Sequence, residues 1–255
     1  MAKKKAFSKV HPAVISVWAA LIATSHLLPA IALVGVGGTL SVATCLLPIA
    51  GIFFGPVAGG LCAAIGSLIG DLIAPAGAWL GMFTFLVPTI DTVICGLVAS
   101  GKKGSLGALG LMLLGIILWF AQEIGRKAWI FGAVVGGYGC LACIVGFFIA
   151  NKFLLKKNPI FKAIAVFVCG IAGMIGAAIL ADNVSVFLFK TPAITWKVLA
   201  PVTPVERTVF SVASMIIGTP LLIGLPKIGI FVGPKDPNEN DEETDNESEE
   251  EVPAE

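Results

Sequence analysis

Residues 48–75 read PIAGIFFGPVAGGLCAAIGSLIGDLIAP, which is two apolar runs joined by a Gly-Pro pair. The pattern predicts a short helix that ends at Phe54, a break at Gly55–Pro56, and a second helix that closes at Asp71. Gly55 tolerates a strained backbone, and Pro56 suits the first turn of a new helix, where its missing N–H is no loss. The stretch therefore predicts a helical hairpin.

The second helix of this hairpin carries small residues on two adjoining faces. One face holds Gly59, Ala63, Gly66 and Gly70, and the other holds Gly60, Ala64, Ser67 and Asp71. A helix face made of such small side chains lets other backbones approach closely, which is how helices associate in lipid. Packing alone explains the pattern as well as a functional motif does, so both interpretations stay open here.

The composition indicates an all-α, polytopic integral membrane protein. Of 255 residues, 57% are hydrophobic and 13% are charged, and apolar runs of membrane-spanning length recur along the chain. About eight apolar segments can be drawn: 13–33, 41–54, 56–74, 80–100, 105–122, 129–150, 161–181 and 207–230. The second segment is short for a full crossing and fits a tilted or partial span.

Charge divides the chain into a basic N-terminus (1–12), a transmembrane bundle (13–234) and an acidic tail (235–255). The tail holds eleven acids and one lysine, whereas residues 1–234 hold sixteen Lys/Arg and five acids. Because the tail has no aromatic residue and cannot bury a core, we expect it to be disordered and cytoplasmic. An interaction role for the tail stays open.

The loop charges predict the topology. With the N-terminus inside, the internal segments hold twelve Lys/Arg and the external loops hold five. The positive-inside rule then favours an even number of crossings of the plasma membrane, with both termini in the cytoplasm. The longest external connection is expected at 182–206, as a dipping or capping loop or as an interfacial anchor.

Few residues in the apolar runs offer chemistry. His26, Asp71, Asp91 and Glu123 are ionisable, costly in lipid and therefore functional candidates. A purely structural role, in which Asp91 hydrogen-bonds to a neighbouring helix, explains this residue equally well. Glu123 fits a solvated pair with Arg126. The six cysteines suit packing, and no spacing predicts a metal site or a cofactor. The chain lacks HExxH and GxSxG motifs, so we do not expect an enzyme.

Residues 47–75 resemble the second and third helices of the substrate-binding (S) components of energy-coupling factor (ECF) vitamin transporters. In that family an apolar helix ends in a G-P turn, and a small-residue helix follows and closes with G-D-L. Residues 19–23, AALIA, resemble the A-x-x-x-A motif of the family's first helix. Residues 81–104 are similar to its fourth helix, and residues 206–225 to its last. The family usually has six helices, so eight segments imply an extra helix pair.

The resemblance implies the substrate-binding subunit of an ECF-type ABC importer, which captures a vitamin or related small nutrient from outside. Its partners would be a transmembrane coupling protein and two cytosolic ATPases, with Ala19 and Ala23 as the flat docking face. The ligand would bind under the external loops 34–41, 75–79 and 182–206. Nucleic acid is not an expected partner.

Most vitamin-like ligands are partly apolar and polar at one end, so aromatic and polar side chains are the candidate contacts. The predicted contacts are His26, Trp79, Phe83, Asp91, Trp119, Trp129 and Tyr138. Two alternatives stay open. In a stand-alone secondary carrier, Asp91 and His26 would couple ion movement to transport, and in a membrane scaffold the acidic tail would recruit a partner.

Overall fold

A computed structural model describes residues 7, 11–28, 31–32 and 39–235. In these residues the helices are α1 (Pro12–Ser25), α2 (Ala43–Ile73), α3 (Leu86–Ala99), α4 (Lys102–Ala121), α5 (Glu123–Lys127), α6 (Trp129–Leu155), α7 (Pro159–Phe189) and α8 (Ala193–Gly224). Short 3-10 turns are η1 (Pro75–Gly77), η2 (Gly81–Phe83) and η3 (Leu225–Ile228), and β1 (Ile31–Ala32) pairs antiparallel with β2 (Thr39–Leu40). The predictions for residues 1–6, 8–10, 29–30, 33–38 and 236–255 lie outside the described residues, and these include most of the predicted external loop 34–41.

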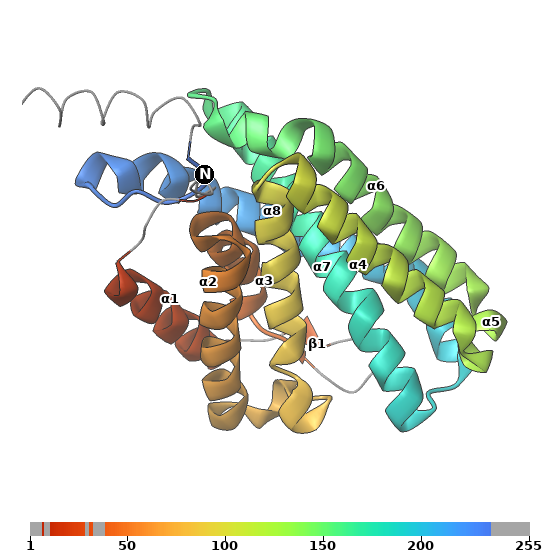
Figure 1. Cartoon of the computed structure of the whole chain (residues 1–255). Coiled ribbons are helices and arrows are strands. Elements are labelled where there is room, and N and C mark those ends of the chain that lie inside the picture. The colour runs from red at the N-terminus through yellow and green to blue at the C-terminus, as the bar shows by residue number, and fades with distance from the viewer. Residues whose placement is uncertain (1–6, 8–10, 29–30, 33–38, 236–255) are drawn as a thin grey trace, which may run out of the picture.

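The structure confirms an all-α membrane bundle. Within the described ranges, six helices are long and apolar enough to cross a membrane: α2, α3 with η2, α4, α6, α7, and α8 with η3. Helix α7 is the most buried of them and lies in the middle of the bundle, whereas α1 is shorter and lies on its outside against α2 (Figure 1).

Helix α2 contains both predicted helices of residues 48–75, with the break where the sequence places it. Gly55 has φ 82° and ψ 179°, so the helix is interrupted there. The second half folds back and packs closely beside the first. Gly59 allows this close packing, since a Cβ atom there would lie 2.7 Å from the carbonyl oxygen of Ala50. The eight predicted segments thus correspond to α1, the two halves of α2, α3, α4, α6, α7 and α8.

The prediction of a long external connection at 182–206 is wrong. Helix α7 runs on to Phe189 and α8 already begins at Ala193, so residues 190–192 alone join them. Three prolines among aromatic residues in 182–206 favour a loop in the sequence, but proline is tolerated in membrane helices that pack against others. Trp196 shows how this part packs: it is fully buried, with its ring centroid 5.2 Å from those of both Trp119 and Phe131.

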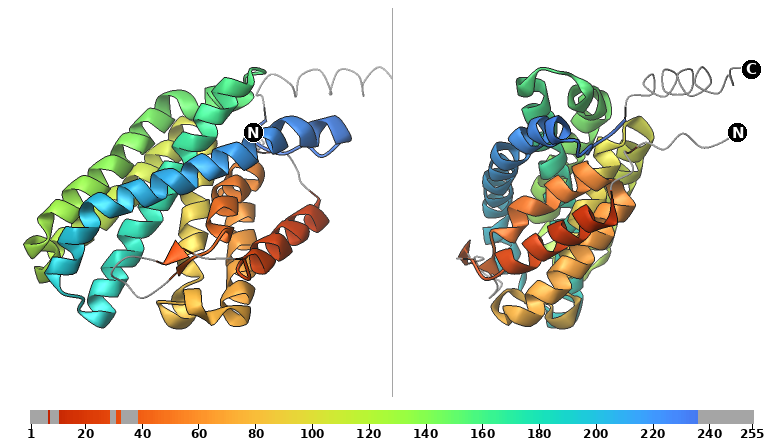
Figure 2. Two further views of the ribbon diagram at one scale, coloured as in Figure 1. Left: turned by 180° about the vertical axis from the view of Figure 1, so that it is seen from behind. Right: turned by 90° about the vertical axis from the view of Figure 1, so that its left-hand side faces the viewer.

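Successive segments run in alternating directions and give the bundle two distinct ends (Figures 1 and 2). The basic end contains Gly55, the turns α3–α4 and α6–α7, and the final residues up to Lys235. Phe7 bridges to Pro234 there, and the amide of Gly233 donates to Phe53, 2.9 Å away. The opposite end, here the pocket end, contains the turns α1–α2, α2–α3, α4–α6 and α7–α8.

Candidate functional site

A cavity of about 230 Å³ lies toward the pocket end, between α1, α2, α3, α7, α8 and the segment that joins α2 to α3. Small and apolar residues such as Ala43, Leu47, Val87, Met174 and Ala178 form much of its wall. Its polar wall consists of His26, Ser41, Thr44, Ser67, Asp71, Trp79, Thr84, Asp91, Asp182 and Arg207. An apolar wall with a few converging polar groups is typical of a small-molecule site.

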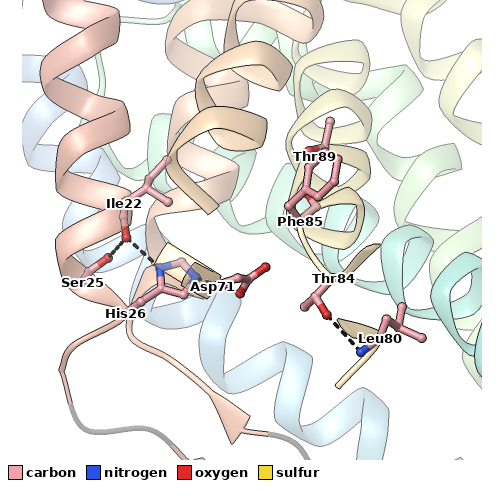
Figure 3. Close-up of polar contacts among 8 residues, drawn as sticks. All are labelled: Ile22, Ser25, His26, Asp71, Leu80, Thr84, Phe85 and Thr89. Atoms are coloured by element: carbon pink, nitrogen blue, oxygen red, sulfur yellow. Dashed lines mark hydrogen bonds and ion pairs between the residues drawn. The ribbon is translucent and has the colours of Figure 1, made fainter. Parts of the chain in front are cut away.

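His26 joins the end of α1 to the end of α2. Its Nδ1 atom lies 2.9 Å from the carbonyl oxygen of Ile22, and its Nε2 atom lies 3.9 Å from Oδ1 of Asp71. Figure 3 shows the two side chains close together. Gly70 makes room for the imidazole, because a Cβ atom there would lie 2.6 Å from Cγ of His26. Asp71 of the predicted motif therefore lines the cavity, and Gly70 leaves the space that His26 occupies.

Asp91 is 3% exposed and lies on α3 at the wall of the cavity. The Cys95 thiol, one turn further along α3, donates to Oδ1 of Asp91 over 3.3 Å. Helix α7 approaches here because Gly173 has no side chain: a Cβ atom would lie 2.6 Å from the carbonyl oxygen of Asp91. An ionised carboxylate has about four acceptor sites and the thiol occupies one, so Asp91 can still accept hydrogen bonds from a molecule in the cavity.

Sequence reasoning missed Asp182 on α7 and Arg207 on α8, although both line the cavity. The sequence places Asp182 at the start of the expected loop 182–206 and Arg207 at the first position of the apolar segment 207–230, so neither stands inside a predicted span. In the part of the chain that the structure describes, no carboxylate lies within ion-pair distance of Arg207, and its buried Nε atom has no hydrogen-bond partner. One sequence feature could have identified both residues: each is an ionisable residue at the edge of a membrane-length apolar run.

Ser67 is a second buried polar group without a partner. Its side chain is fully buried on α2, and its Oγ atom has no hydrogen-bond partner among the described residues. A buried polar atom that is left unpaired costs free energy. Ser67 and Arg207 both line the cavity, so a bound molecule there can satisfy them.

The cavity also concentrates acidic charge. Residues 1–234 hold five acids, and three of these, Asp71, Asp91 and Asp182, line the cavity together with Arg207 and His26. Charged groups at this depth are stabilised when they are paired or hydrogen-bonded. The cavity can therefore offer hydrogen-bond acceptors and one guanidinium donor to a small molecule.

Only three of the seven predicted ligand contacts, His26, Trp79 and Asp91, line the cavity. Phe83 and Trp129 are more than half exposed on the outer surface. Trp119 is fully buried, with its ring centroid 4.7 Å from that of Phe131. The hydroxyl of Tyr138 lies 2.8 Å from that of Thr208. These four side chains pack elsewhere in the bundle or face outward.

The predicted docking residues Ala19 and Ala23 face α2. They are 7% and 4% exposed, and a Cβ atom on Gly66 would lie 2.7 Å from the carbonyl oxygen of Ala19. The face of α1 that is exposed carries other small residues at helical spacing, Ser16, Ala20 and Thr24. Val17 and Leu21 are exposed beside them.

Comparison with known proteins finds one family. Residues 7–135 match the family described as ECF-type riboflavin transporter, S component. The match covers 129 of 255 residues (135 − 7 + 1), which is half of the chain. It includes His26, Ser67, Asp71 and Asp91, whereas Asp182 and Arg207 lie beyond it. No curated protein and no solved structure matches the chain significantly.

Proposed function

The chain belongs to the family of ECF-type riboflavin transporter S components, and from this premise we propose that it captures riboflavin or a closely related flavin for uptake. The chain is thus a multi-pass protein of the plasma membrane and a substrate-binding subunit of an ECF transporter. S components are transporter subunits and not enzymes. Two points are proposed in addition: the identity of the ligand and the energy source that drives its uptake.

The observation that carries the ligand proposal is the pair of unpartnered polar atoms in the cavity wall, Nε of Arg207 and Oγ of Ser67. A flavin has a flat ring system with an imide edge of two carbonyls and one N–H, and a chain of hydroxyls. Arg207 suits an imide carbonyl and Asp91 suits the N–H, because a guanidinium only donates and a carboxylate only accepts.

The rest of the cavity suits the remaining parts of a flavin. Leu47, Val87 and Met174 offer an apolar wall to the rings, and Trp79 offers an aromatic face. Ser41 and Thr44 offer hydroxyls that can bond to a polyol chain. One cavity thus combines the apolar and polar contacts that such a molecule needs.

Riboflavin binding can be tested directly on the purified full-length protein in a non-ionic detergent. Titration of riboflavin, followed by its fluorescence, is expected to show saturable binding with one site per chain. Thiamine, an organic cation, serves as the competitor because the cavity is acidic. No saturable riboflavin binding, or displacement of riboflavin by thiamine at equal concentration, would contradict the flavin proposal.

We further propose that uptake is driven by ATP through a membrane coupling protein and two cytosolic ATPases. The sequence carries no Walker A motif, so ATP hydrolysis is assigned to partners. The exposed face of α1 supports this, since Ser16, Ala20 and Thr24 allow close approach of another helix. The role of Ala19 and Ala23 in docking stays a prediction.

The orientation in the membrane is also a proposal. The basic end carries Lys102, Lys103, Lys152, Lys156, Lys157, Lys162, Lys227 and Lys235, whereas the turns and helix ends at the pocket end carry Arg126, Lys127, Lys190 and Lys197. Positive charge is enriched in cytoplasmic loops. We therefore place the basic end in the cytoplasm, with the cavity toward the outside, where a nutrient arrives.

A further inference from the structure

Exposed lysines cluster where two turns meet at the basic end. Lys102 and Lys103 begin α4, whereas Lys152, Lys156 and Lys157 lie at the end of α6 and just beyond it, and all five are exposed. The side-chain amide of Asn151 on α6 donates to the carbonyl oxygen of Ala99 on α3, 2.9 Å away, which ties the two turns together. These five residues are called the lysine cluster below.

The lysine cluster has no acidic partner in the described ranges 7, 11–28, 31–32 and 39–235. The two ion pairs found there are His26–Asp71 and Lys127–Glu123, both toward the pocket end. Two of the lysines rest instead over aromatic rings: Nζ of Lys156 lies 3.9 Å from the ring centroid of Phe161, and Nζ of Lys102 lies 5.6 Å from that of Phe147. The cluster is therefore an uncompensated positive surface.

The opposite charge is carried by residues 236–255 of the same chain. They hold eleven acids and no Lys or Arg, and they follow directly on Lys235. The residues just before Lys235 are held at the basic end, because Pro234 bridges to Phe7 and the amide of Gly233 donates to Phe53 over 2.9 Å. Lys235, the residue that precedes the acidic segment, thus lies at the same end of the bundle as the lysine cluster.

We propose that the acidic segment 236–255 binds the lysine cluster of its own chain. Twenty residues reach at most about 70 Å when extended, so the segment is long enough to reach a surface at the same end of the bundle as Lys235. Because it is tethered, its effective concentration near the cluster is on the order of millimolar. Contacts between exposed charges are screened by salt, so the binding is strong at low ionic strength and lost at high ionic strength.

Carbodiimide cross-linking of the full-length protein in non-ionic detergent, followed by mass spectrometry, tests the contact. This reagent joins a carboxylate directly to an amine within contact distance. At low salt we expect links from residues 236–255 to Lys152, Lys156 and Lys157. Lys190 at the pocket end is also exposed and should form no such link. Links to Lys190 as frequent as those to the lysine cluster, or links that persist at 0.5 M salt, would overturn the proposal.

A variant without the acidic charges distinguishes binding of the segment to the lysine cluster from binding of another anion, such as lipid. All eleven acids of 236–255 are replaced by Asn or Gln, which keeps the length of the chain. Acetylation of the five lysines should be about threefold faster in the variant at low salt, since several weak charge contacts are lost together, with Lys190 unchanged. Equal rates would overturn the proposal. The proposal would also be overturned if, in lipid nanodiscs, the acetylation rate of the five lysines fell with increasing anionic lipid content and was the same in the variant and the wild type.

Discussion

The Nε2 atom of His26, at the end of α1, lies 3.9 Å from Oδ1 of Asp71, at the end of α2. Both side chains line the cavity, so α1 is connected to the cavity although most of this helix lies outside the bundle. Because α1 also carries the proposed docking face, this pair connects that face to the cavity proposed as the ligand site.

Replacing Asp71 by Asn should weaken riboflavin binding by about tenfold, because the cavity loses a charged acceptor that also holds His26. The measurement is the dissociation constant of riboflavin, determined by fluorescence titration. Glu123→Gln is the matched control, since Glu123 is an exposed acid at the same end that pairs with Lys127 over 2.7 Å. Equal affinity of the Asp71 variant and wild type would remove Asp71 from the site.

Replacing Gly66 by Leu should lower the thermal stability of the purified protein. A Cβ atom there would already lie 2.7 Å from the carbonyl oxygen of Ala19, and overpacking of this kind costs about 1–3 kcal/mol. Gly137→Leu on α6 is the control, because a Cβ atom at Gly137 meets nothing within 4 Å. Equal melting temperatures for the two variants would mean that the α1–α2 contact does not depend on Gly66.

The break in α2 could be predicted from the sequence because its causes are local. A glycine followed by a proline signals a positive φ and a new helix start, and Gly55 has φ 82°. The membrane bundle was predictable for a similar reason, since hydropathy over about 20 residues identifies membrane-spanning helices.

The composition of the cavity could not be predicted in the same way, because it depends on how distant helices pack. Arg207 and Asp182 reach the cavity only because α8 starts at Ala193 and α7 runs to Phe189. Residue type alone could not separate Trp79, which lines the cavity, from Trp119, which packs against Phe131. Helical periodicity placed Ala19 and Ala23 on one face but could not show that α2 covers it.

The topology can be tested with single cysteines at positions 157 and 190 in a variant without native cysteines. Lys157 lies at the basic end and Lys190 at the pocket end, and the excess of lysines at the basic end predicts that it is cytoplasmic. An impermeant thiol reagent added to intact cells should label position 190 and not position 157. The reverse labelling would invert the proposed orientation.

Partner docking on α1 can be tested with two pairs of tryptophan variants. Ala20→Trp with Thr24→Trp places bulk on the exposed face, so riboflavin binding should persist while ATPase-dependent uptake falls at least about tenfold. Ala19→Trp with Ala23→Trp places bulk against α2 and should lower the melting temperature. Uptake of radiolabelled riboflavin in cells, beside pull-down of the ATPases, gives the comparison.

Full uptake by the Ala20/Thr24 pair would remove this face from the docking surface. Uptake that continues after deletion of the ATPases would favour the stand-alone carrier instead.

Binding of the flavin in the cavity between α1, α2, α3, α7 and α8 is tested most directly by the riboflavin affinity of an Arg207→Gln variant. Lys197→Gln is the matched control, because Lys197 is an exposed cation on the same helix and does not line the cavity. Loss of a charged hydrogen-bond donor should weaken binding by about 10- to 100-fold for Arg207→Gln, with Lys197→Gln unchanged and both variants equally stable to heat. Wild-type affinity in the Arg207→Gln variant would contradict binding of the flavin in this cavity.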